Sequence, residues 1–240
     1  MSNAFVAAIH SMQNDMRTME TVSQNMVNIA TPGYKRAIPV APAFGEAMAQ
    51  AQTPALQAQL PATVSSVLDL TSGTVKQTGQ ALDLAISGDG FFELETPEGL
   101  AYTRAGDFRR DAQGRLVSQQ GFAVQGLGGA LQLAPGASID AQGRVMHDGR
   151  EMGQLKLVRF ADTRLLHKNG AGLLQPASGV TGTADPRPAL QVGFLEGSNV
   201  TPMREMVALM QTTRHFEAAQ KLYQGYDEAL GSAIQKLGQF

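Results

Sequence analysis

Apolar residues near the N-terminus recur every three or four positions, which is the spacing of one face of an α-helix. Residues 3–30 contain neither proline nor glycine, and Ser2 or Asn3 can cap the start of a helix there. The spacing therefore predicts one long helix over 3–30. Its apolar stripe consists of Phe5, Ile9, Met12, Met16, Met19, Val22, Met26 and Ile29.

The four residues that follow, Thr31-Pro32-Gly33-Tyr34, predict an abrupt stop. Proline suits the second position of a β-turn, and glycine supplies the positive φ that a type II turn requires at its third position. Pro32 also disfavours the helical conformation of Thr31. We therefore expect the helix to end in a type II turn at this point.

The C-terminal segment has the same helical spacing. Thr201-Pro202 is a typical start, with threonine as the N-cap, proline in the first turn and the acidic Glu205 close behind. A second apolar row, Val207, Met210, Leu222 and Ile234, runs beside the first, and pairing with one helix would leave it uncovered. The first row consists of Met206, Leu209, Thr213, Phe216, Ala219, Tyr223, Tyr226, Leu230, Ala233 and Leu237.

Between the two helical segments, apolar residues alternate with polar or small ones, as in half-buried strands. Leu82, Leu84 and Ile86 show this pattern, and glycine-containing turns separate the strand candidates. Asp111-Ala-Gln-Gly-Arg-Leu116 recurs as Asp140-Ala-Gln-Gly-Arg-Val145. Aspartate suits the first position of a type I turn and glycine the fourth, so we expect two similar hairpins.

Residues 37–63 are rich in alanine, glutamine and proline. This composition predicts an extended arm, with a short helix near 44–52, although a flexible linker fits equally well.

Together these patterns predict a multi-part α+β fold. Long N- and C-terminal helices are expected to pack as a coiled-coil-like pair, with a mainly antiparallel β domain inserted between them. Residues 1–30 and 200–240 would form a helical assembly domain, 31–63 an extended arm or linker, and 64–199 a β-rich outer domain. Because the second apolar row lacks a partner, we expect the helices to complete their packing in an assembly of several chains.

Composition and motifs exclude several classes of functional site. The chain has no cysteine and a formal net charge of −2, without a basic run that would indicate nucleic-acid binding. No apolar run of about 18 residues predicts a membrane helix. The four histidines lack metal-ligand spacing, and Gly88–Glu93 lacks the third glycine of a dinucleotide loop. We expect no enzyme activity, no cofactor and no metal site.

Three segments resemble the axial proteins of the bacterial flagellar rod and hook. "NMVNIATPGYKR" (25–36) resembles the turn that follows their N-terminal helix. "ISGDGFFELETPEGLAYTRAGDFRRDAQGRLVSQQGFAVQG" (86–126) is similar to their β-domain core, and "LEGSNVTPMREMVALMQTTRHFEAAQKL" (195–222) to their returning helix. The three matches occur in the order of the family and cover roughly half the chain.

The resemblance implies a structural subunit of the flagellar basal-body rod, most similar to proximal-rod proteins, that polymerises through its terminal helices around the export channel. It also implies type III export without a cleaved signal peptide. The implied partners are itself, neighbouring rod proteins and the export apparatus, with no nucleic acid and no membrane insertion. A distal-rod or hook-type protein, or a soluble β-domain binding module on a coiled-coil stalk, are the alternatives.

The family motif assigns two groups of residues to assembly. The remaining positions of interest are the stripe residues expected to pack the helices. The assembly residues are Asn25, Asn28, Thr31, Pro32, Gly33, Tyr34 and Lys35, and Ser198, Asn199 and Val200. The helix-packing residues are Phe5, Ile9, Met12, Met16, Met19, Met26, Met206, Leu209, Phe216, Tyr223, Leu230 and Leu237.

Overall fold

The computed structural model describes residues 2–40, 65–169 and 172–237. These residues form two compact units. The described parts of 1–27, 37–67 and 201–240 make up the first, which we call the helical unit. Residues 28–36 and 68–200 make up the second, the β unit. The expected arm over 37–63 lies mostly outside the described residues.

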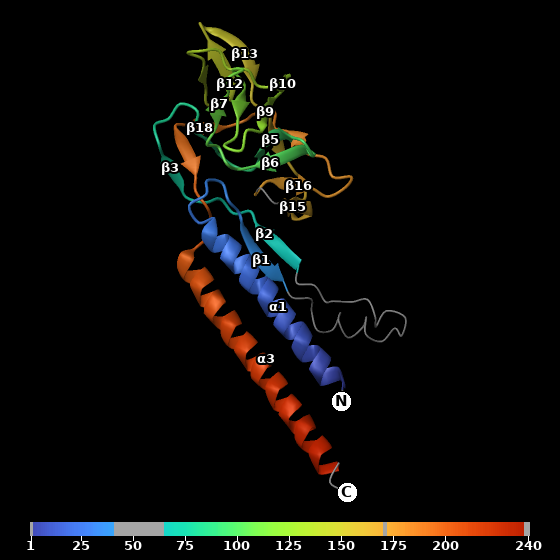
Figure 1. Ribbon diagram of the computed structural model, residues 1–240. Helices are drawn as coiled ribbons and strands as arrows, with labels where there is room; N and C mark the ends of the chain where they lie inside the picture. Colours follow the sequence, from blue (N-terminus) through green and yellow to red (C-terminus); the bar gives the residue numbers. More distant parts are fainter. Residues whose placement is uncertain (1, 41–64, 170–171, 238–240) are drawn as a thin grey trace. The chain divides into compact units, whose positions relative to one another are not determined.

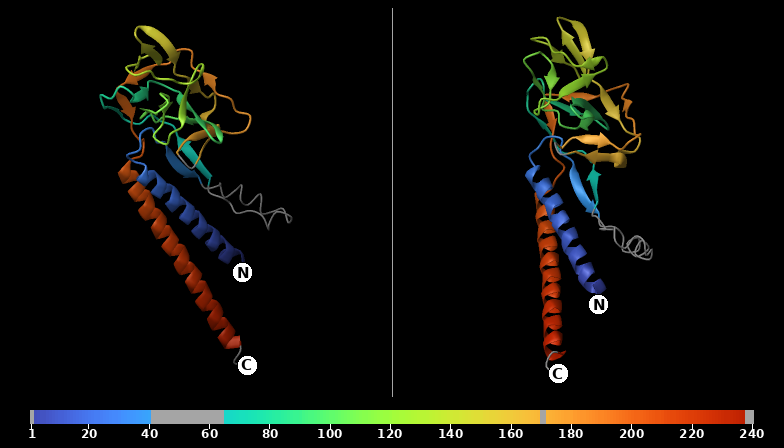
Figure 2. Two further views of the ribbon diagram at one scale, coloured as in Figure 1. Left: turned by 45° about the horizontal axis from the view of Figure 1, so that its top comes forward. Right: turned by 45° about the vertical axis from the view of Figure 1, so that its right-hand side comes forward.

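The helical unit contains two long helices, α1 (Ser2–Val27) and α3 (Pro202–Leu237), which lie side by side in Figures 1 and 2. They are antiparallel, because contacts move toward the C-terminus of α3 as they move toward the N-terminus of α1. Thr213 Oγ1 lies 3.9 Å from Met19 Sδ, and His215 Nδ1 lies 2.7 Å from Asp15 Oδ2. Strands β1 (Arg36–Val40) and β2 (Ser65–Asp69) pair as a small sheet.

Local signals place the helix ends. The helix α3 begins at Pro202, as predicted, and the N–H groups of Arg204 and Glu205 donate to the Thr201 carbonyl. The helix α1 ends at Val27, a few residues before the predicted end, and turns follow it. The predicted stop is confirmed: Gly33 has φ of 66°, and the Tyr34 N–H donates to the Thr31 carbonyl at 3.3 Å.

The β unit is built from short strands, and every strand pairing described within it is antiparallel. Its largest sheet has ten strands, and β5 lies at its centre between β6 and β9. The strands are β3 (Val75–Gln77), β4 (Leu84–Ile86), β5 (Phe91–Thr96), β6 (Gly99–Thr103), β7 (Arg109–Arg110), β8 (Leu116–Val117), β9 (Ala123–Gly126), β10 (Gly129–Ala130), β11 (Ser138–Ile139), β12 (Arg144–His147), β13 (Arg150–Gln154), β14 (Leu157–Arg159), β15 (Leu166–Lys168), β16 (Leu174–Pro176), β17 (Thr183–Ala184), β18 (Leu190–Val192) and β19 (Phe194–Glu196), with a 3₁₀ turn at Thr163–Leu165.

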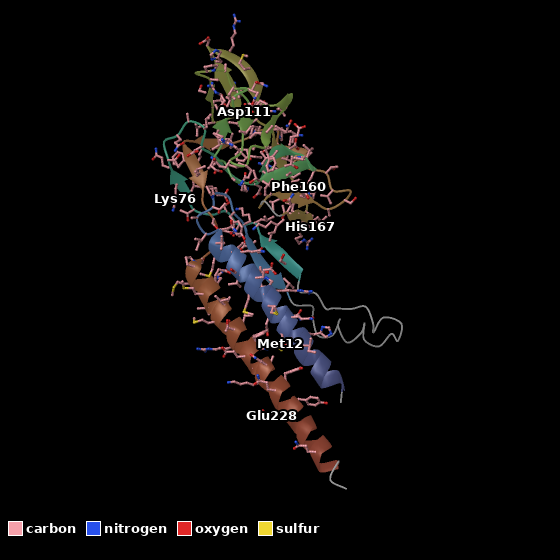
Figure 3. All side chains as sticks on the ribbon, viewed as in Figure 1. Met12, Lys76, Asp111, Phe160, His167 and Glu228 are labelled. Carbon is pink, nitrogen blue, oxygen red and sulfur yellow. The ribbon has the colours of Figure 1, made fainter. Side chains whose placement is uncertain are left out.

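The two predicted hairpins are present and have matching geometry. In each, the glycine N–H donates to the carbonyl of the leading aspartate, at 3.1 Å for Gly114 and 2.9 Å for Gly143. Figure 3 labels Asp111 at the first of them. The Oδ1 atom of that aspartate caps the turn by accepting from the backbone N–H of Arg115 at 2.8 Å, and Asp140 does the same for Arg144 at 2.9 Å.

The β unit has two apolar clusters. The larger one includes Phe92, Leu94 and Leu155, and the Phe92 ring meets Phe108 edge-on with 4.9 Å between ring centroids. The smaller one is centred on Phe160, labelled in Figure 3, whose ring meets Tyr102 edge-on at 4.8 Å. Burial of these large side chains is the main source of stability for the unit.

The expected coiled-coil-like pairing of the terminal helices is wrong. A coiled coil would bury the stripe positions in a continuous seam between the two helices. Instead Met16 is 58% exposed, Met206 48% and Tyr223 37%. Two side-by-side helices cover only one narrow strip of each other, and the apolar residues here are spread over a wider face. The structure shows two helices and a large antiparallel β-rich unit.

Candidate assembly site

Two buried polar clusters surround the motif residues, one in each unit. We call the contacts of Asn25 with Ala37 and Glu205 the asparagine junction, and the contacts of Glu196 with Lys35 and Arg104 the glutamate cluster. Buried polar groups are costly unless they are paired, so each cluster constrains the course of the backbone around it.

In the asparagine junction, the Asn25 side chain pairs with the backbone of β1 as a neighbouring strand would. Its amide Nδ2 donates to the Ala37 carbonyl at 2.8 Å, and its Oδ1 accepts from the Ala37 N–H at 3.0 Å. The same Nδ2 donates to Glu205 Oε2 at 3.1 Å. Asn25 and Glu205 are both fully buried. One side chain therefore connects α1, β1 and the first turn of α3, where a carboxylate is also favoured by the helix dipole.

In the glutamate cluster, the buried Glu196 binds two cations. Its Oε1 accepts from Lys35 Nζ at 2.5 Å, and its Oε2 from Arg104 Nη1 at 3.3 Å. Oε1 also accepts from the Gly73 N–H at 3.1 Å, and the main-chain carbonyl of Glu196 accepts from the Gly33 N–H at 2.7 Å. Four segments of the β unit therefore meet at one residue.

Burial dominates the electrostatics of this cluster. Desolvation lowers the pKa of Lys35 and the pKa of Arg104, and Glu196 opposes both changes. Arg104 has further contacts: Nη2 donates to the Gly88 carbonyl at 2.7 Å, and its guanidinium lies 5.4 Å from the centroid of the Phe91 ring. Its buried Nε has no hydrogen-bond partner among the described residues. Because two cations share one carboxylate, removing that carboxylate would deprive both of them of their hydrogen-bonded counter-charge.

Asn199 joins the same region through its side chain. Its Oδ1 accepts from the Arg36 N–H at 2.7 Å, and its Nδ2 donates to the carbonyls of Asp69 at 2.7 Å and Thr71 at 3.1 Å. A hydrogen bond from the Thr71 hydroxyl is the main cause that lowers the pKa of Asp69. Asn199 therefore links the return segment to Arg36, the first residue of β1, and to the backbone at the end of β2.

Gly33 is required by close packing as well as by its backbone conformation. A Cβ atom at this position would lie 2.2 Å from the Ala105 nitrogen and 2.3 Å from the Arg104 carbonyl carbon. Backbone atoms cannot move aside as a side chain can. The turn therefore fits against the Arg104–Ala105 backbone only when it carries glycine.

The structure places the other motif residues at or beside these contacts. Thr31 Oγ1 lies 3.2 Å from Asn28 Oδ1, and Pro32 occupies the second position of the turn. Ser198 Oγ accepts from the N–H of the buried Val200 at 3.2 Å.

The sequence motifs do not single out the central members of the two clusters, Glu196, Arg104 and Glu205. Glu196 and Arg104 lie inside the segments that resemble the family, and the sequence around Glu205 indicates only an acidic residue in the first turn of a helix. Their pairing across long stretches of chain has no local signal.

The expected helix-packing residues have a more mixed placement. Phe5, Leu230 and Leu237 lie outside the side chains that the structure describes. Met16, Met206 and Tyr223 are exposed. The half-buried positions are Ile9, Met12, Met19, Met26, Leu209 and Phe216.

The described residues offer no arrangement that suggests chemistry on a bound ion: no group of three or more histidine, aspartate or glutamate side chains is placed to hold a metal. Within the same residues, neither helix has both the length and the apolar character needed to cross a membrane.

Comparisons with known proteins give one consistent family. Residues 85–147 match the model of the flagellar hook protein FlgE/F/G D1 domain. Residues 191–236 match the model of the flagellar basal body rod FlgEFG protein C-terminal region. The first match lies in the β unit, and the second covers β19, the glutamate cluster residue Glu196 and most of α3.

Relatives of full length agree with these matches. The chain is 31% identical to the flagellar basal-body rod protein FlgG of Bacillus subtilis, with 98% of each chain covered. It is 30% identical to the flagellar basal-body rod protein FlgF of Rhizobium meliloti and 28% identical to that of Salmonella typhimurium, with 99% of each chain covered in both cases. The chain belongs to the family of flagellar basal-body rod proteins, which are structural, non-enzymatic components of the bacterial flagellum.

Proposed function

We propose that the protein polymerises into the rod of the flagellar basal body through its terminal helices. The observation that carries this proposal is an uncovered apolar row at the start of α3. Met203 is 71% exposed, Met206 48%, Val207 44% and Met210 55%.

The spacing of these four residues places them on one face of the helix. Contacts with α1 come from other positions of α3, such as Thr213 and His215. Soluble proteins rarely leave a contiguous apolar row in water unless a partner covers it. Methionine suits such an interface, because its flexible side chain adapts to neighbours that meet it at different angles.

The same reasoning supports different positions in the rod for different segments of the chain. Residues 1–30 and 200–240 would form the inner, assembling layer around the export channel, 31–63 an arm between layers, and 64–199 the outer layer. The partners would be further copies of this chain and other rod proteins. The subunit would leave the cell through the flagellar type III export apparatus, as the resemblance of its motifs to rod proteins implies.

Within the family, the return segment "LEGSNV" (195–200) supports a place in the proximal rod. Relatives named FlgG and FlgF are similar to the chain to nearly the same degree, 31% and 30%. Imaging of intact basal bodies with this chain traced in place tests the assignment, and its appearance in the distal rod would contradict it.

A charge on the apolar row tests the polymerisation proposal. We expect Met210→Glu to abolish rod assembly and motility in cells that lack the endogenous protein, because a carboxylate cannot be buried there without a partner. Gln211→Glu is the matched control, since it adds the same charge at the adjacent exposed position of α3. Both purified variants should keep the thermal unfolding midpoint of the wild type. Normal motility with Met210→Glu would contradict polymerisation through this face.

A further inference from the structure

The ring of Tyr34 lies under a lysine from a distant strand. Tyr34 is only 5% exposed, and its carbonyl accepts from the Asn199 N–H at 3.4 Å. Lys168, the last residue of β15, places its Nζ 3.2 Å from the centroid of the Tyr34 ring. This distance is well inside the range of about 6 Å over which a cation is attracted to the face of an aromatic ring.

The ring of Tyr34 is the group that interacts with the charge of Lys168. Lys168 is half-buried, and burial lowers its pKa to about 8 without any compensation from a carboxylate of the described residues. His167, labelled in Figure 3, is exposed. Because successive side chains of a strand alternate, it faces the side of β15 opposite to Lys168. The nearby Glu98 carboxylate accepts a hydrogen bond from Asn169 at 3.3 Å.

We propose that Lys168 is a positioning residue that holds the Thr31–Tyr34 turn in place by seating its ammonium group on the face of Tyr34. The backbone contacts of the turn fix its peptide groups, and the lysine fixes the direction of the side chain that the turn projects. The proposal rests on the proposed function in one respect: it assigns importance to the turn because the chain is expected to assemble through the helices on either side of it.

Two opposing effects act on the ammonium group. Partial removal from water disfavours its charge, whereas the negative face of the ring favours it. Burial lowers the pKa of Lys168 to about 8, and the ring face acts against this lowering. Deprotonation of Lys168 in mildly alkaline solution should therefore release the contact while the rest of the turn remains hydrogen-bonded.

A titration of Lys168 in the full-length protein tests the contact itself. In the wild type at pH 6, NMR of the lysine side chains should show Lys168 Hε resonances shifted upfield by the ring, with a midpoint near pH 8. Replacing the ring by Tyr34→Leu should lower this midpoint by about one pKa unit, because the favourable ring face is lost. Tyr34→Phe keeps the ring and should leave the midpoint near the wild-type value.

The wild-type spectrum keeps the test decisive even if Tyr34→Leu fails to fold. Absence of the upfield shift in the wild type would overturn the proposal. So would a Tyr34→Leu midpoint equal to or above that of the wild type.

Motility of cells that lack the endogenous protein tests the positioning role. Lys168→Arg keeps a cation that stacks on the ring and should support rod assembly, whereas Lys168→Met should reduce it. Normal assembly with Lys168→Met would overturn the positioning role. If Met210→Glu still abolished assembly in the same cells, the proposed polymerisation through α3 would stand independently of that result.

Discussion

Glu196 Oε1 accepts a hydrogen bond from Lys35 Nζ at 2.5 Å, although the two residues are 161 positions apart in the chain. Lys35 follows the turn after the first helix, and Glu196 ends the strand before the second. The pair is almost completely buried, with side chains about 2% exposed. Within the β unit, one buried ion pair therefore joins the segment after the first helix to the segment before the second.

Removal of the Glu196 charge should strongly destabilise the β unit. Glu196→Gln leaves Lys35 and Arg104 buried without their hydrogen-bonded counter-charge, and breaking such a pair costs about 3–5 kcal/mol. We expect a clear fall in the midpoint of urea unfolding, measured by a β-unit probe such as the NMR signals of Tyr102.

The matched control for Glu196→Gln is Asp162→Asn, which removes the partner of the exposed Arg164 at 2.9 Å. Its unfolding midpoint should equal that of the wild type, because exposed pairs contribute little. Equal midpoints for Glu196→Gln and the wild type would show that the buried cluster is dispensable.

Substitution of Gly33 should prevent correct formation of the turn. In Gly33→Val the side chain meets backbone atoms of Arg104 and Ala105 within 2.3 Å, and the residue must also adopt a φ of 66°. Both effects are unfavourable, so we expect loss of rod assembly and a lower thermal unfolding midpoint.

Gly225 provides the contrasting position. It lies within α3, and a Cβ there meets nothing within 4 Å. Gly225→Ala should stabilise the helix by up to about 1 kcal/mol and preserve assembly. Assembly and stability of Gly33→Val at wild-type levels would mean that the turn can form in another way.

Loss of the Asn25 amide should destabilise the helical unit. Asn25→Leu has a similar volume but leaves the N–H and carbonyl of Ala37 without this partner. An unsatisfied buried polar group costs about 1–3 kcal/mol. Circular dichroism at 222 nm should therefore show a lower thermal midpoint for the helices, whereas Gln13→Leu, at an exposed position of α1, should not change it. A midpoint unchanged by Asn25→Leu would refute a structural role for the junction.

Tyr102 should make the β unit sensitive to alkaline pH. Burial raises the pKa of its hydroxyl to about 12 from 10.0, and the Glu93 carboxylate, 3.3 Å from the hydroxyl, adds to the effect. The unfolded chain loses this proton near pH 10, and the folded chain keeps it until about pH 12. The contribution of Tyr102 to the free energy of unfolding is therefore fully present below pH 10, and it is lost as the pH rises from 10 to 12.

Comparison with Tyr102→Phe isolates this contribution. The midpoint of urea unfolding should decrease from pH 9 to pH 11 in both proteins, and the decrease should be larger for the wild type than for the variant. Equal slopes would show that Tyr102 ionises as easily in the folded protein as in the unfolded chain.

Features that depend on a few neighbouring residues were predictable from the sequence. The type II turn at Thr31–Tyr34 follows from the conformations open to proline and glycine, and the start of α3 follows from Thr201-Pro202. The hairpins at Asp111 and Asp140 follow from the same kind of local preference. Each of these backbone conformations depends on four or five neighbouring residues, so it can be predicted from the sequence alone.

Which side chains meet across the fold was decided only by the tertiary structure. An apolar stripe shows that a helix buries a face, but it does not show how much of that face a single partner can cover, and the coiled-coil expectation failed for this reason. The ion pairs of Glu196 and the three-way contact of Asn25 join residues far apart in the chain, and a charged residue carries no local mark of its distant partner. Local backbone geometry is determined by short-range steric contacts. Which buried side chains pair with each other depends instead on the course of the whole backbone, which decides which groups are buried close together.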